Sequence, residues 1–314
     1  MEKMTTKVFI DGKAGTTGLR IYERLQARND IELLTLSEEE RKNPESRRKM
    51  LNSCNIAFLC LPDDASREAV AMIENPDVVV LDTSTAHRTL DDWAYGFPEL
   101  SSVFFQKVAS SRRIAVPGCH ASGFIALVRP LIDAGIISAD TLLTCHSLTG
   151  YSGGGKKMIA EYDDPERPQL FDAPRQYGLT QQHKHLKEMV KISGCSSAPV
   201  FSPIVADYYS GMLVTVPLFK SQLCNGATIE DIRKLYRDLY NNKMVFYAEN
   251  ASEGGLLSGN AMSGKDSMQI MVEGNEERIL LLARYDNLGK GASGAAVECM
   301  NIVMQKAPET GLDL

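Results

Sequence analysis

Cysteine and histidine side chains occur in two short stretches that could carry out nucleophilic chemistry. Cys119 follows a Pro117-Gly118 corner and precedes an apolar stripe of helical spacing from Phe124 to Ile132. The stripe predicts a helix that begins at or just after Cys119. The N–H groups and dipole of a helix N-terminus favour a thiolate and could bind the oxyanion of an attacked carbonyl. The alternative is a packing residue at a tight corner, because cysteine is often buried.

The stretch QQHKHLKEM offers such a cysteine a general acid or base, with His183 and His185 two residues apart. Residues two apart share a face in extended backbone but not on a helix. We therefore expect both histidines in a loop or at the start of a helix, one facing the chemistry and the other supporting it. The competing interpretation is a metal site that adds Cys119-His120 and Cys145-His146, but these spacings match no usual zinc pattern, and no metal is expected.

A glycine-rich turn near the N-terminus predicts a nucleotide site. The turn GKAGTTG follows an apolar strand at 8–10 and opens a helix, as in a variant of the dinucleotide fingerprint. Glycines there allow a tight turn and bring the backbone close to a pyrophosphate at the helix N-terminus. A purely structural turn is the alternative. The residues expected to contact the cofactor are Gly12, Gly15, Thr16, Thr17 and Gly18.

The end of the second expected strand bears on the choice between NAD and NADP. NAD-binding folds usually carry Asp or Glu there, but this chain has Ser37, followed by glutamates at 38–40 and then Arg41. A hydroxyl residue with a nearby arginine suits a 2′-phosphate, so NADP is favoured. The glutamates could instead take the acidic role, which would favour NAD.

A second glycine-rich stretch, GYSGGGKK, could bind an anion through backbone amides and two lysines. It lacks the residue order of a Walker A motif, and a solvated turn is the alternative. The candidates for substrate binding are Ser152, Gly153, Lys156 and Lys157.

The elements that must position these residues fall into two kinds. Up to Gly118, short apolar strands alternate with helices, which predicts an α/β Rossmann-type domain with a parallel sheet covered on both faces. Beyond the next helix, strands follow one another with one clear helix at 227–243, which predicts an α+β domain with a mostly antiparallel sheet. The segment 163–174 is expected to be a surface loop, and an alanine-rich helix is expected at 291–307.

Composition excludes several classes of protein. The chain has 314 residues, 44% hydrophobic and 24% charged, and a net charge of −6, so we expect two domains and no nucleic-acid partner. No apolar run is long enough to span a bilayer, and residues 1–12 lack the features of a signal peptide. Seven dispersed cysteines without a CxxC indicate reduced thiols and a cytosolic location.

Several motifs together resemble the short form of the N-acetyl-γ-glutamyl-phosphate reductase family, in the semialdehyde dehydrogenase group: FIDGKAGTTGLRI, DTSTAHR, YGFPEL, VPGCHASGF, GYSGGGKKMI, TQQHKHLKEM and DNLGKGASGAAVECMN. The resemblance implies NADPH-dependent reduction of N-acetyl-γ-glutamyl phosphate to N-acetylglutamate semialdehyde with release of phosphate, a step of arginine biosynthesis. It makes Cys119 the nucleophile and places the acid/base histidine in the pair, with His185 slightly favoured. It also implies that Asn287, Lys290 and Gly291 belong to the cofactor site.

The resemblance further implies the domain division: a dinucleotide-binding domain at 1–118 and 287–314, and a catalytic and dimerisation domain at 119–286, in a homodimer or homotetramer. Longer family members read approximately DLSADFR where this chain reads DTSTAHR, so no catalytic role is assigned to Asp82 or His87. The rival functions are an aspartate-semialdehyde dehydrogenase, a non-catalytic NADP-binding redox sensor, and a thiol hydrolase that needs no nucleotide.

Overall fold

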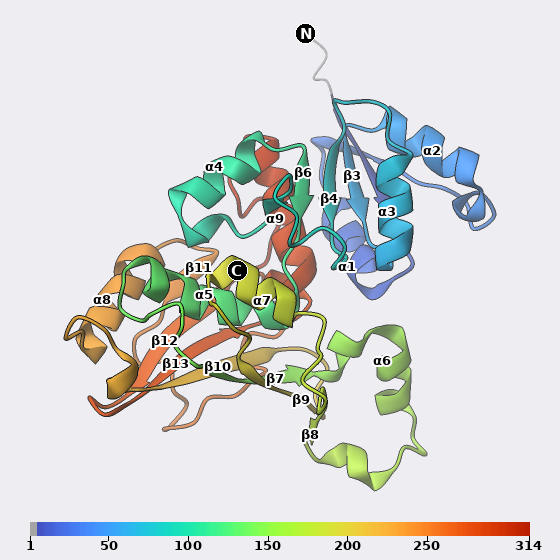
Figure 1. Ribbon diagram of the computed structural model, residues 1–314. Helices are drawn as coiled ribbons and strands as arrows, with labels where there is room; N and C mark the ends of the chain where they lie inside the picture. Colours follow the sequence, from blue (N-terminus) through green and yellow to red (C-terminus); the bar gives the residue numbers. More distant parts are fainter. Residues whose placement is uncertain (1–4) are drawn as a thin grey trace. The chain divides into compact units, whose positions relative to one another are not determined.

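The computed structural model describes residues 5–314, so the expected start of the first domain at Met1 and part of the 1–12 stretch lie outside the described residues. The chain divides into two compact units (Figure 1). Unit 1 contains the residues up to Pro98 together with Ser102–Pro117 and Ala292–Leu312. Unit 2 contains Glu99–Ser101, Gly118–Gly291 and Asp313–Leu314. Residues 287–291, which the sequence placed with the first domain, therefore group with unit 2.

Unit 1 is built on a parallel sheet of six strands in the order β2-β1-β3-β4-β6-β5. The strands are β1 (Thr6–Asp11), β2 (Ile31–Leu34), β3 (Ile56–Leu59), β4 (Val79–Asp82), β5 (Ala94–Tyr95) and β6 (Arg113–Ala115). The helices are α1 (Thr16–Leu25), α2 (Pro44–Ser53), α3 (Asp63–Ala71), α4 (Ser102–Ser110) and α9 (Gly294–Val303). The parallel Rossmann-type arrangement expected from the alternating pattern is confirmed.

Two apolar cores cover the two faces of this sheet. Successive residues of β1 point to opposite faces, so Val8 and Ile10 lie in the core shared with α1 and α9, whereas Phe9 lies in the core shared with α2 and α3. The last helix, α9, is coloured red beside the blue and teal elements of unit 1 in Figure 1, and it packs beside α1, α4 and β4. The sequence did not predict α2, because Leu51 is its only buried residue and it shows no apolar stripe.

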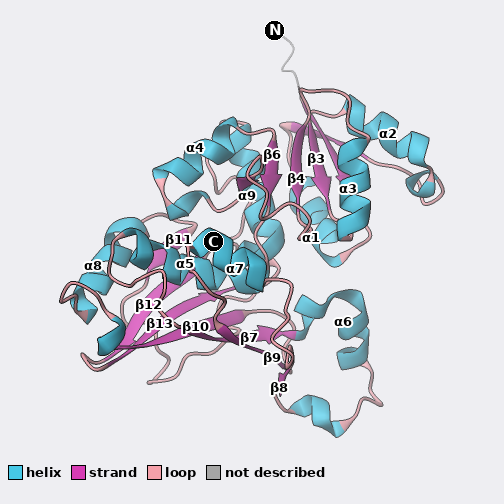
Figure 2. Cartoon of the chain, viewed as in Figure 1, coloured by secondary structure: helices cyan, strands magenta, loops and turns pink. Residues whose placement is uncertain are grey.

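Unit 2 contains a sheet of seven strands in the order β11-β12-β13-β10-β7-β9-β8. The strands are β7 (Thr144–Gly150), β8 (Arg175–Gln176), β9 (Val200–Ala206), β10 (Met212–Phe219), β11 (Val245–Tyr247), β12 (Met268–Gly274) and β13 (Arg278–Tyr285). The helices are α5 (Cys119–Asp133), α6 (Gly155–Asp163), α7 (Leu186–Ser193) and α8 (Ile229–Leu239). Helices α5 and α8 pack on the sheet, and α7 packs on α5 (Figure 2).

The expectation of a mostly antiparallel sheet in this unit is wrong, because the sheet is mixed. The pairs β7–β9 and β11–β12 are parallel. Parallel neighbours need a crossover connection, and the chain between β7 and β9 supplies one that contains α6 and α7. The sequence indicated a single helix among these strands, so the crossover was missed. That helix, α8, begins with the expected capping box of Thr228 and Asp231.

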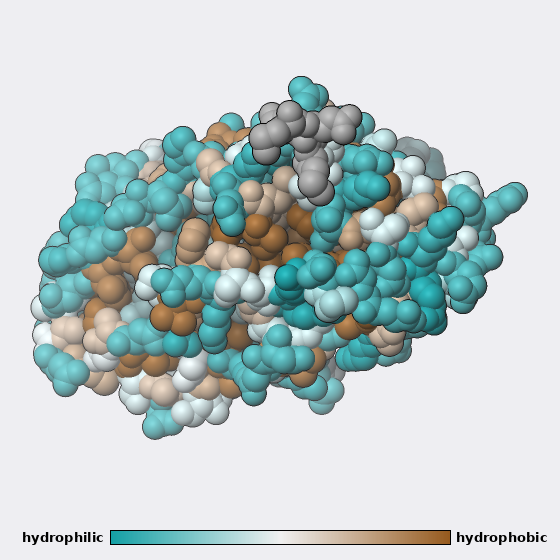
Figure 3. Space-filling model, turned by 90° about the horizontal axis from the view of Figure 1, so that it is seen from above, coloured by the Kyte–Doolittle hydropathy of each residue, from teal (hydrophilic) through white to brown (hydrophobic). Residues whose placement is uncertain are grey.

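No helix among residues 5–314 combines the length and apolar character needed to cross a membrane. Hydrophilic residues cover much of the face seen in Figure 3, with hydrophobic residues between them. All seven cysteines are reduced in the structure. The cytosolic location expected from the cysteine pattern stays a prediction.

Candidate active site

Cys119 is the first residue of α5, as the helical stripe predicted. Its N-cap is Gly118, which has no side chain to accept the first N–H groups of the helix. The backbone around the cysteine is fixed by the buried Tyr285, whose hydroxyl donates to the Cys119 carbonyl at 2.5 Å and accepts from the Gly123 N–H at 3.0 Å. Cys119 is of intermediate exposure, unlike the buried residues that follow it in α5. This arrangement presents a sulfur at the positive end of a buried helix.

A buried carboxylate ties α7 to the residue that precedes the cysteine. Glu188 is 2% exposed, and its Oε1 accepts the Gly118 N–H at 2.8 Å. Glu188 lies in the first turn of α7, and His185 is the N-cap of that helix. The hydrogen bond therefore fixes the histidine pair relative to the start of α5. The sequence drew attention to this segment but assigned no role to Glu188.

His183 and His185 lie at the start of α7, as expected, with ring centroids 4.8 Å apart. The His185 backbone N–H donates to Nδ1 of His183 at 3.2 Å. A neutral His183 therefore carries its proton on Nε2. Burial, and next the charge of Lys184, lower the pKa of His183. The only nitrogen of neutral His183 that can accept a hydrogen bond therefore already accepts one. His185 lies beside it and is 4% exposed.

The structure adds two residues that sequence reasoning missed as members of this cluster. His120 had been weighed only as a metal ligand, and Tyr177 had not been considered. Nε2 of His120 lies 2.7 Å from the Tyr177 hydroxyl. The His120 ring lies 5.6 Å from that of His183 and 5.7 Å from that of His185, between ring centroids. Tyr177 precedes His183 by six positions in a polar stretch, and no periodicity in the sequence marks it.

The glycine-rich turn of unit 1 requires glycine at two of its three positions. Gly12 has a φ of +88°, and a Cβ there would lie 2.2 Å from the Cys60 carbonyl oxygen. A Cβ on Gly18 would lie 2.5 Å from the Gly12 carbonyl oxygen. Gly15 is the N-cap of α1 and provides no side-chain cap, so the first N–H groups of α1, including those of Thr16 and Thr17, can face an anion. The turn therefore fits a dinucleotide.

A pocket of about 270 Å³ lies between this turn and the end of β2. Its lining includes two of the expected cofactor residues, Gly12 and Arg41, and also Lys13, Tyr22 and Glu38. The Lys13 ammonium sits 3.3 Å above the centroid of the Tyr22 ring. Gly15, Gly18 and Ser37 do not line the pocket.

The charges at the end of β2 are mutually paired. Arg41 forms an ion pair with Glu38. Ser37 accepts the Glu40 N–H at 3.2 Å, while its own N–H donates to Glu40 Oε2 at 3.1 Å. This backbone hydrogen bond, followed by the one from the Ser37 side chain, lowers the pKa of Glu40. Two of the three glutamates that could have bound a ribose hydroxyl, Glu38 and Glu40, thus have partners within the chain.

The three residues expected from the C-terminal motif make their described contacts inside unit 2. Asn287 accepts the Gly211 N–H at 2.8 Å and donates to Ser152 Oγ at 2.9 Å. The Lys290 ammonium pairs with Glu99 at 2.5 Å, with side chains 2% and 6% exposed. A Cβ on Gly291 would lie 3.1 Å from the Cβ of Cys119. Contact of these residues with a cofactor stays a prediction.

The stretch GYSGGGKK forms a 3-10 turn, Tyr151–Gly154, followed by α6. Ser152 is buried against Asn287, whereas Lys156 and Lys157 are exposed on α6. Lys157 lies 3.8 Å from Glu161, one turn along the same helix. No described contact brings either lysine to Cys119, so their predicted role in binding substrate stays a prediction.

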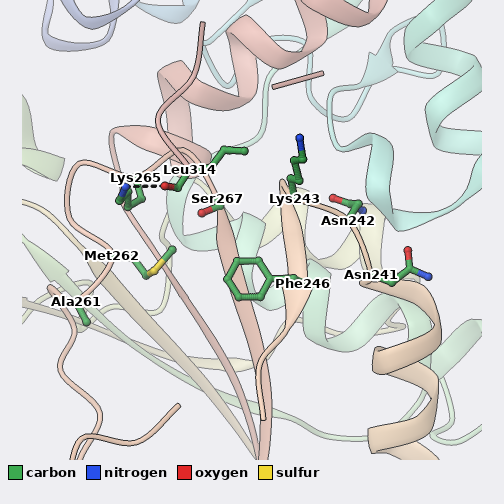
Figure 4. A pocket seen from close by; sticks show the side chains of 9 residues that line it. All are labelled: Asn241, Asn242, Lys243, Phe246, Ala261, Met262, Lys265, Ser267 and Leu314. Carbon is green, nitrogen blue, oxygen red and sulfur yellow. Dashed lines mark hydrogen bonds between the residues drawn. The ribbon is translucent and has the colours of Figure 1, made fainter. Parts of the chain in front are cut away.

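A second pocket, of about 700 Å³, opens in unit 2 (Figure 4). Its lining residues are Asn241, Asn242, Lys243, Phe246, Ala261, Met262, Lys265, Ser267 and Leu314. None of the residues expected to take part in catalysis or binding lines it. Within residues 5–314, no group of three or more His, Cys, Asp or Glu side chains is arranged to hold a metal ion.

Comparison with known proteins gives the same division of the chain into two parts. Residues 7–107 match the semialdehyde dehydrogenase NAD binding domain, and residues 119–287 match the semialdehyde dehydrogenase dimerisation domain. The chain thus carries a nicotinamide-dinucleotide-binding domain. Among solved structures, aspartate semialdehyde dehydrogenase II of Vibrio cholerae superposes with a TM-score of 0.72 at 17% identity, covering 96% of this chain and 99% of that one. At this identity the similarity concerns the fold alone.

Sequence relatives are much closer. The N-acetyl-gamma-glutamyl-phosphate reductase of Sinorhizobium medicae is 46% identical over 96% of this chain and 99% of its own length. N-acetyl-gamma-glutamyl-phosphate reductase 2 of a Nostoc species is 44% identical over 98% of this chain and 99% of its own. The resemblance seen in the motifs is confirmed, and the chain belongs to the N-acetyl-gamma-glutamyl-phosphate reductase family of the semialdehyde dehydrogenases.

Proposed function

We propose that this chain catalyses the NADPH-dependent reduction of N-acetyl-γ-glutamyl phosphate to N-acetylglutamate semialdehyde with release of phosphate. The relatives at 43–46% identity carry the name of this activity. The observation that carries the proposal is the position of Cys119, which is partly exposed at the start of α5 in the unit that also holds His120, Tyr177 and the histidine pair. Unit 1 would bind the cofactor, and unit 2 would carry catalysis and dimerisation, in a homodimer or homotetramer.

Cys119 is the proposed nucleophile. Its thiolate attacks the γ-acyl carbon, the bond between that carbon and the phosphate oxygen breaks, and a thioester remains on the sulfur. The negative oxygen that forms during the attack lies at the start of α5, where backbone N–H groups and the helix dipole stabilise it. The Gly118 N–H is committed to Glu188. The oxyanion is therefore stabilised by the backbone N–H groups of the residues that follow Gly118 in α5.

His185 is the proposed acid/base residue. Nδ1 of His183 already accepts the His185 N–H, so His183 has no second lone pair with which to receive a proton. His185 would hold a proton for the oxyanion that appears when the thioester is reduced, and would take it back as the aldehyde leaves Cys119. His183 would then orient His185 through their shared contact.

Reduced nicotinamide, when bound, supplies the hydride that no side chain can provide. The turn at Gly12, Gly15 and Gly18 would hold its pyrophosphate, and Thr16 and Thr17 would contribute N–H groups at the start of α1. Preference for NADP is supported by the charges around the 270 Å³ pocket. The carboxylate of Glu38 is neutralised by Arg41, and Lys13 adds a positive charge that would favour a 2′-phosphate.

The rival substrate is the shorter aspartyl phosphate. The aspartate semialdehyde dehydrogenases share the fold at 17% identity, whereas the acetylglutamyl enzymes are 46% identical, so the acetylated substrate is the better supported. The reverse reaction distinguishes them. Purified protein, phosphate and NADP should form NADPH with N-acetylglutamate semialdehyde. NADPH formation only with aspartate semialdehyde would overturn the assignment.

The thioester has a direct test. Protein mixed with N-acetyl-γ-glutamyl phosphate without NADPH should gain one acyl group, which peptide mass spectrometry should locate on Cys119. Cys224 is an internal control, since it is also partly exposed. Burial raises the pKa of Cys54 to about 12, so this buried thiol should not react. An acyl group on another cysteine, or an equal gain in Cys119→Ser, would contradict the mechanism.

A further inference from the structure

Both ring nitrogens of His120, the residue after Cys119, are hydrogen-bonded in the interior of unit 2. Nδ1 lies 2.7 Å from Ser147 Oγ, and Nε2 lies 2.7 Å from the Tyr177 hydroxyl. The three residues come from α5, from β7 and from the loop after β8. His120 is 3% exposed and Ser147 is fully buried. An apolar side chain in place of His120 would leave the buried Ser147 hydroxyl and the partly buried Tyr177 hydroxyl without this partner, so the histidine does more than fill space.

His120 is neutral over the working pH range. Burial, followed by the charges of His183 and Lys184, lowers its pKa to about 3. A neutral imidazole has one donor and one acceptor nitrogen. His120 therefore donates to one of its two partners, Ser147 or Tyr177, and accepts from the other at any moment. When Ser147 donates to Nδ1, the Nε2–H donates to the Tyr177 oxygen and leaves the phenolic proton available to a third group.

The Tyr177 hydroxyl is bonded to the side chain that follows the proposed nucleophile in the chain, 2.7 Å from Nε2 of His120. Burial raises the pKa of Tyr177, and the negative charge of the Cys119 thiolate raises it further. The phenol thus keeps its proton. Its backbone is anchored as well, because the Tyr177 N–H donates to the Pro203 carbonyl at 3.0 Å. A protonated donor beside the thiolate can stabilise an oxyanion that forms on the carbon attached to that sulfur.

We propose that His120 is a positioning residue that accepts from Ser147 and donates to Tyr177, so that the Tyr177 proton points at the oxyanion formed during acyl transfer to Cys119. Tyr177 is then an oxyanion donor besides the N–H groups of α5. No proton is transferred in this step, because the phenol only shares its hydrogen. The inference rests on the proposed acyl-phosphate chemistry.

Two reactions of Cys119 separate this role from a structural one. Acylation by an acyl phosphate builds negative charge on oxygen, whereas alkylation by iodoacetamide displaces iodide and builds none on the carbonyl. Acylation is followed by the burst of phosphate without NADPH, and alkylation by mass spectrometry of the Cys119 peptide. Tyr177→Phe should slow acylation by about 100-fold, the usual cost of one oxyanion donor, and leave alkylation within about twofold. KM should change less than kcat in turnover assays.

His120→Phe should reproduce the Tyr177→Phe effect, and the double variant should be no slower than either single variant, because the two residues act as one unit. His120→Gln places an amide donor near the position of Nε2 and should restore most of the acylation rate. Equal loss of acylation and alkylation in the three single variants would show a structural role and overturn the proposal. Additive losses of acylation rate in the double variant would also overturn the proposal. An unchanged acylation rate in Tyr177→Phe would do the same, because this variant removes only one oxygen and should fold.

The failure of this inference can be told from failure of the proposed function. Acetyl phosphate serves as a second acyl donor. If wild-type protein releases phosphate from acetyl phosphate but not from N-acetyl-γ-glutamyl phosphate, the assigned substrate is wrong, and the variants still decide the role of His120. If wild-type protein is acylated by neither compound, both proposals are overturned.

Discussion

Gly291 tests whether the C-terminal motif acts on the nucleophile or on the cofactor. A Cβ at this position would lie 3.0 Å from the Asp286 carbonyl oxygen, 3.1 Å from the Cβ of Cys119 and 3.3 Å from a ring carbon of Tyr285. Carbon atoms pack at about 3.5 to 4.0 Å. In Gly291→Ala, Cys119 or the loop must therefore move by about half an ångström. The family resemblance implies that Gly291 belongs to the cofactor site, so contact with Cys119 and contact with the cofactor lead to different measurements.

The expected magnitudes follow from this overlap. Overpacking of this kind costs about 1 to 3 kcal/mol, or a fall in Tm of about 3 °C for each kcal/mol in a unit of this size. Since a displacement of about 1 Å near the reacting atoms can cost about 100-fold, half of that should lower kcat by about tenfold. The rate of Cys119 alkylation by iodoacetamide should change as well, while the KM for NADPH stays within about twofold.

Gly226→Ala is the matched control. Gly226 has a φ of +72°, and a Cβ added there would meet no other atom within 4 Å, so alanine at this position adds backbone strain of about 1 kcal/mol without touching Cys119. It should lower Tm and leave kcat and alkylation unchanged. A wild-type kcat and alkylation rate in Gly291→Ala would show that the added methyl group does not displace Cys119. A rise confined to the KM for NADPH would instead return Gly291 to the cofactor site.

Three further predictions concern unit 1. Arg41→Ala should raise the KM for NADPH about tenfold by removing a charge-assisted contact and leave the KM for NADH unchanged in steady-state assays; equal effects on both would refute a 2′-phosphate contact. Gly12→Ala should lower the unfolding free energy, measured by urea titration, by at least about 2 kcal/mol. The reason is that its Cβ would meet the Cys60 carbonyl oxygen at 2.2 Å. Gly15→Ala is the control, because its Cβ would have ordinary contacts, and it should lower the unfolding free energy by less than about 1 kcal/mol. For the fully buried Asp82, burial raises the pKa, but hydrogen bonds from His87, Ser66 and Ser84 outweigh it and lower the pKa. Its stabilisation is thus present above the ordinary value of 3.8 and is lost as pH falls through the lower folded-state pKa. Asp82→Asn should cost about 2 to 4 kcal/mol at pH 7, with the deficit shrinking below the ordinary value of 3.8; a deficit independent of pH would contradict this.

The sequence could predict the fold where the determining pattern is local. The apolar strand, glycine turn and helix at the N-terminus, and the stripe that makes Cys119 the first residue of α5, depend on neighbours within a few positions. The close approach of Gly18 to the Gly12 carbonyl and the capping box at Thr228 are local in the same sense. The close approach of Gly12 to the Cys60 carbonyl is not, because it depends on the packing of the turn against the end of β3. The sheet of unit 2 was misjudged, because parallel pairing of β7 with β9 depends on a crossover through α6 and α7.

The sequence by itself marked Cys119 as the candidate nucleophile, and it marked the histidine pair and the dinucleotide turn, since each is distinguished by residue types at short spacing. Only the tertiary structure decided what surrounds them. His120 meets Tyr177 across 57 positions, Gly118 meets Glu188 across 70, and Lys290 meets Glu99 across 191. Such pairs form because packed helices and paired strands bring distant segments together. Hydrogen bonding between buried polar groups then fixes their geometry, and no periodicity in one sequence records which partners will meet.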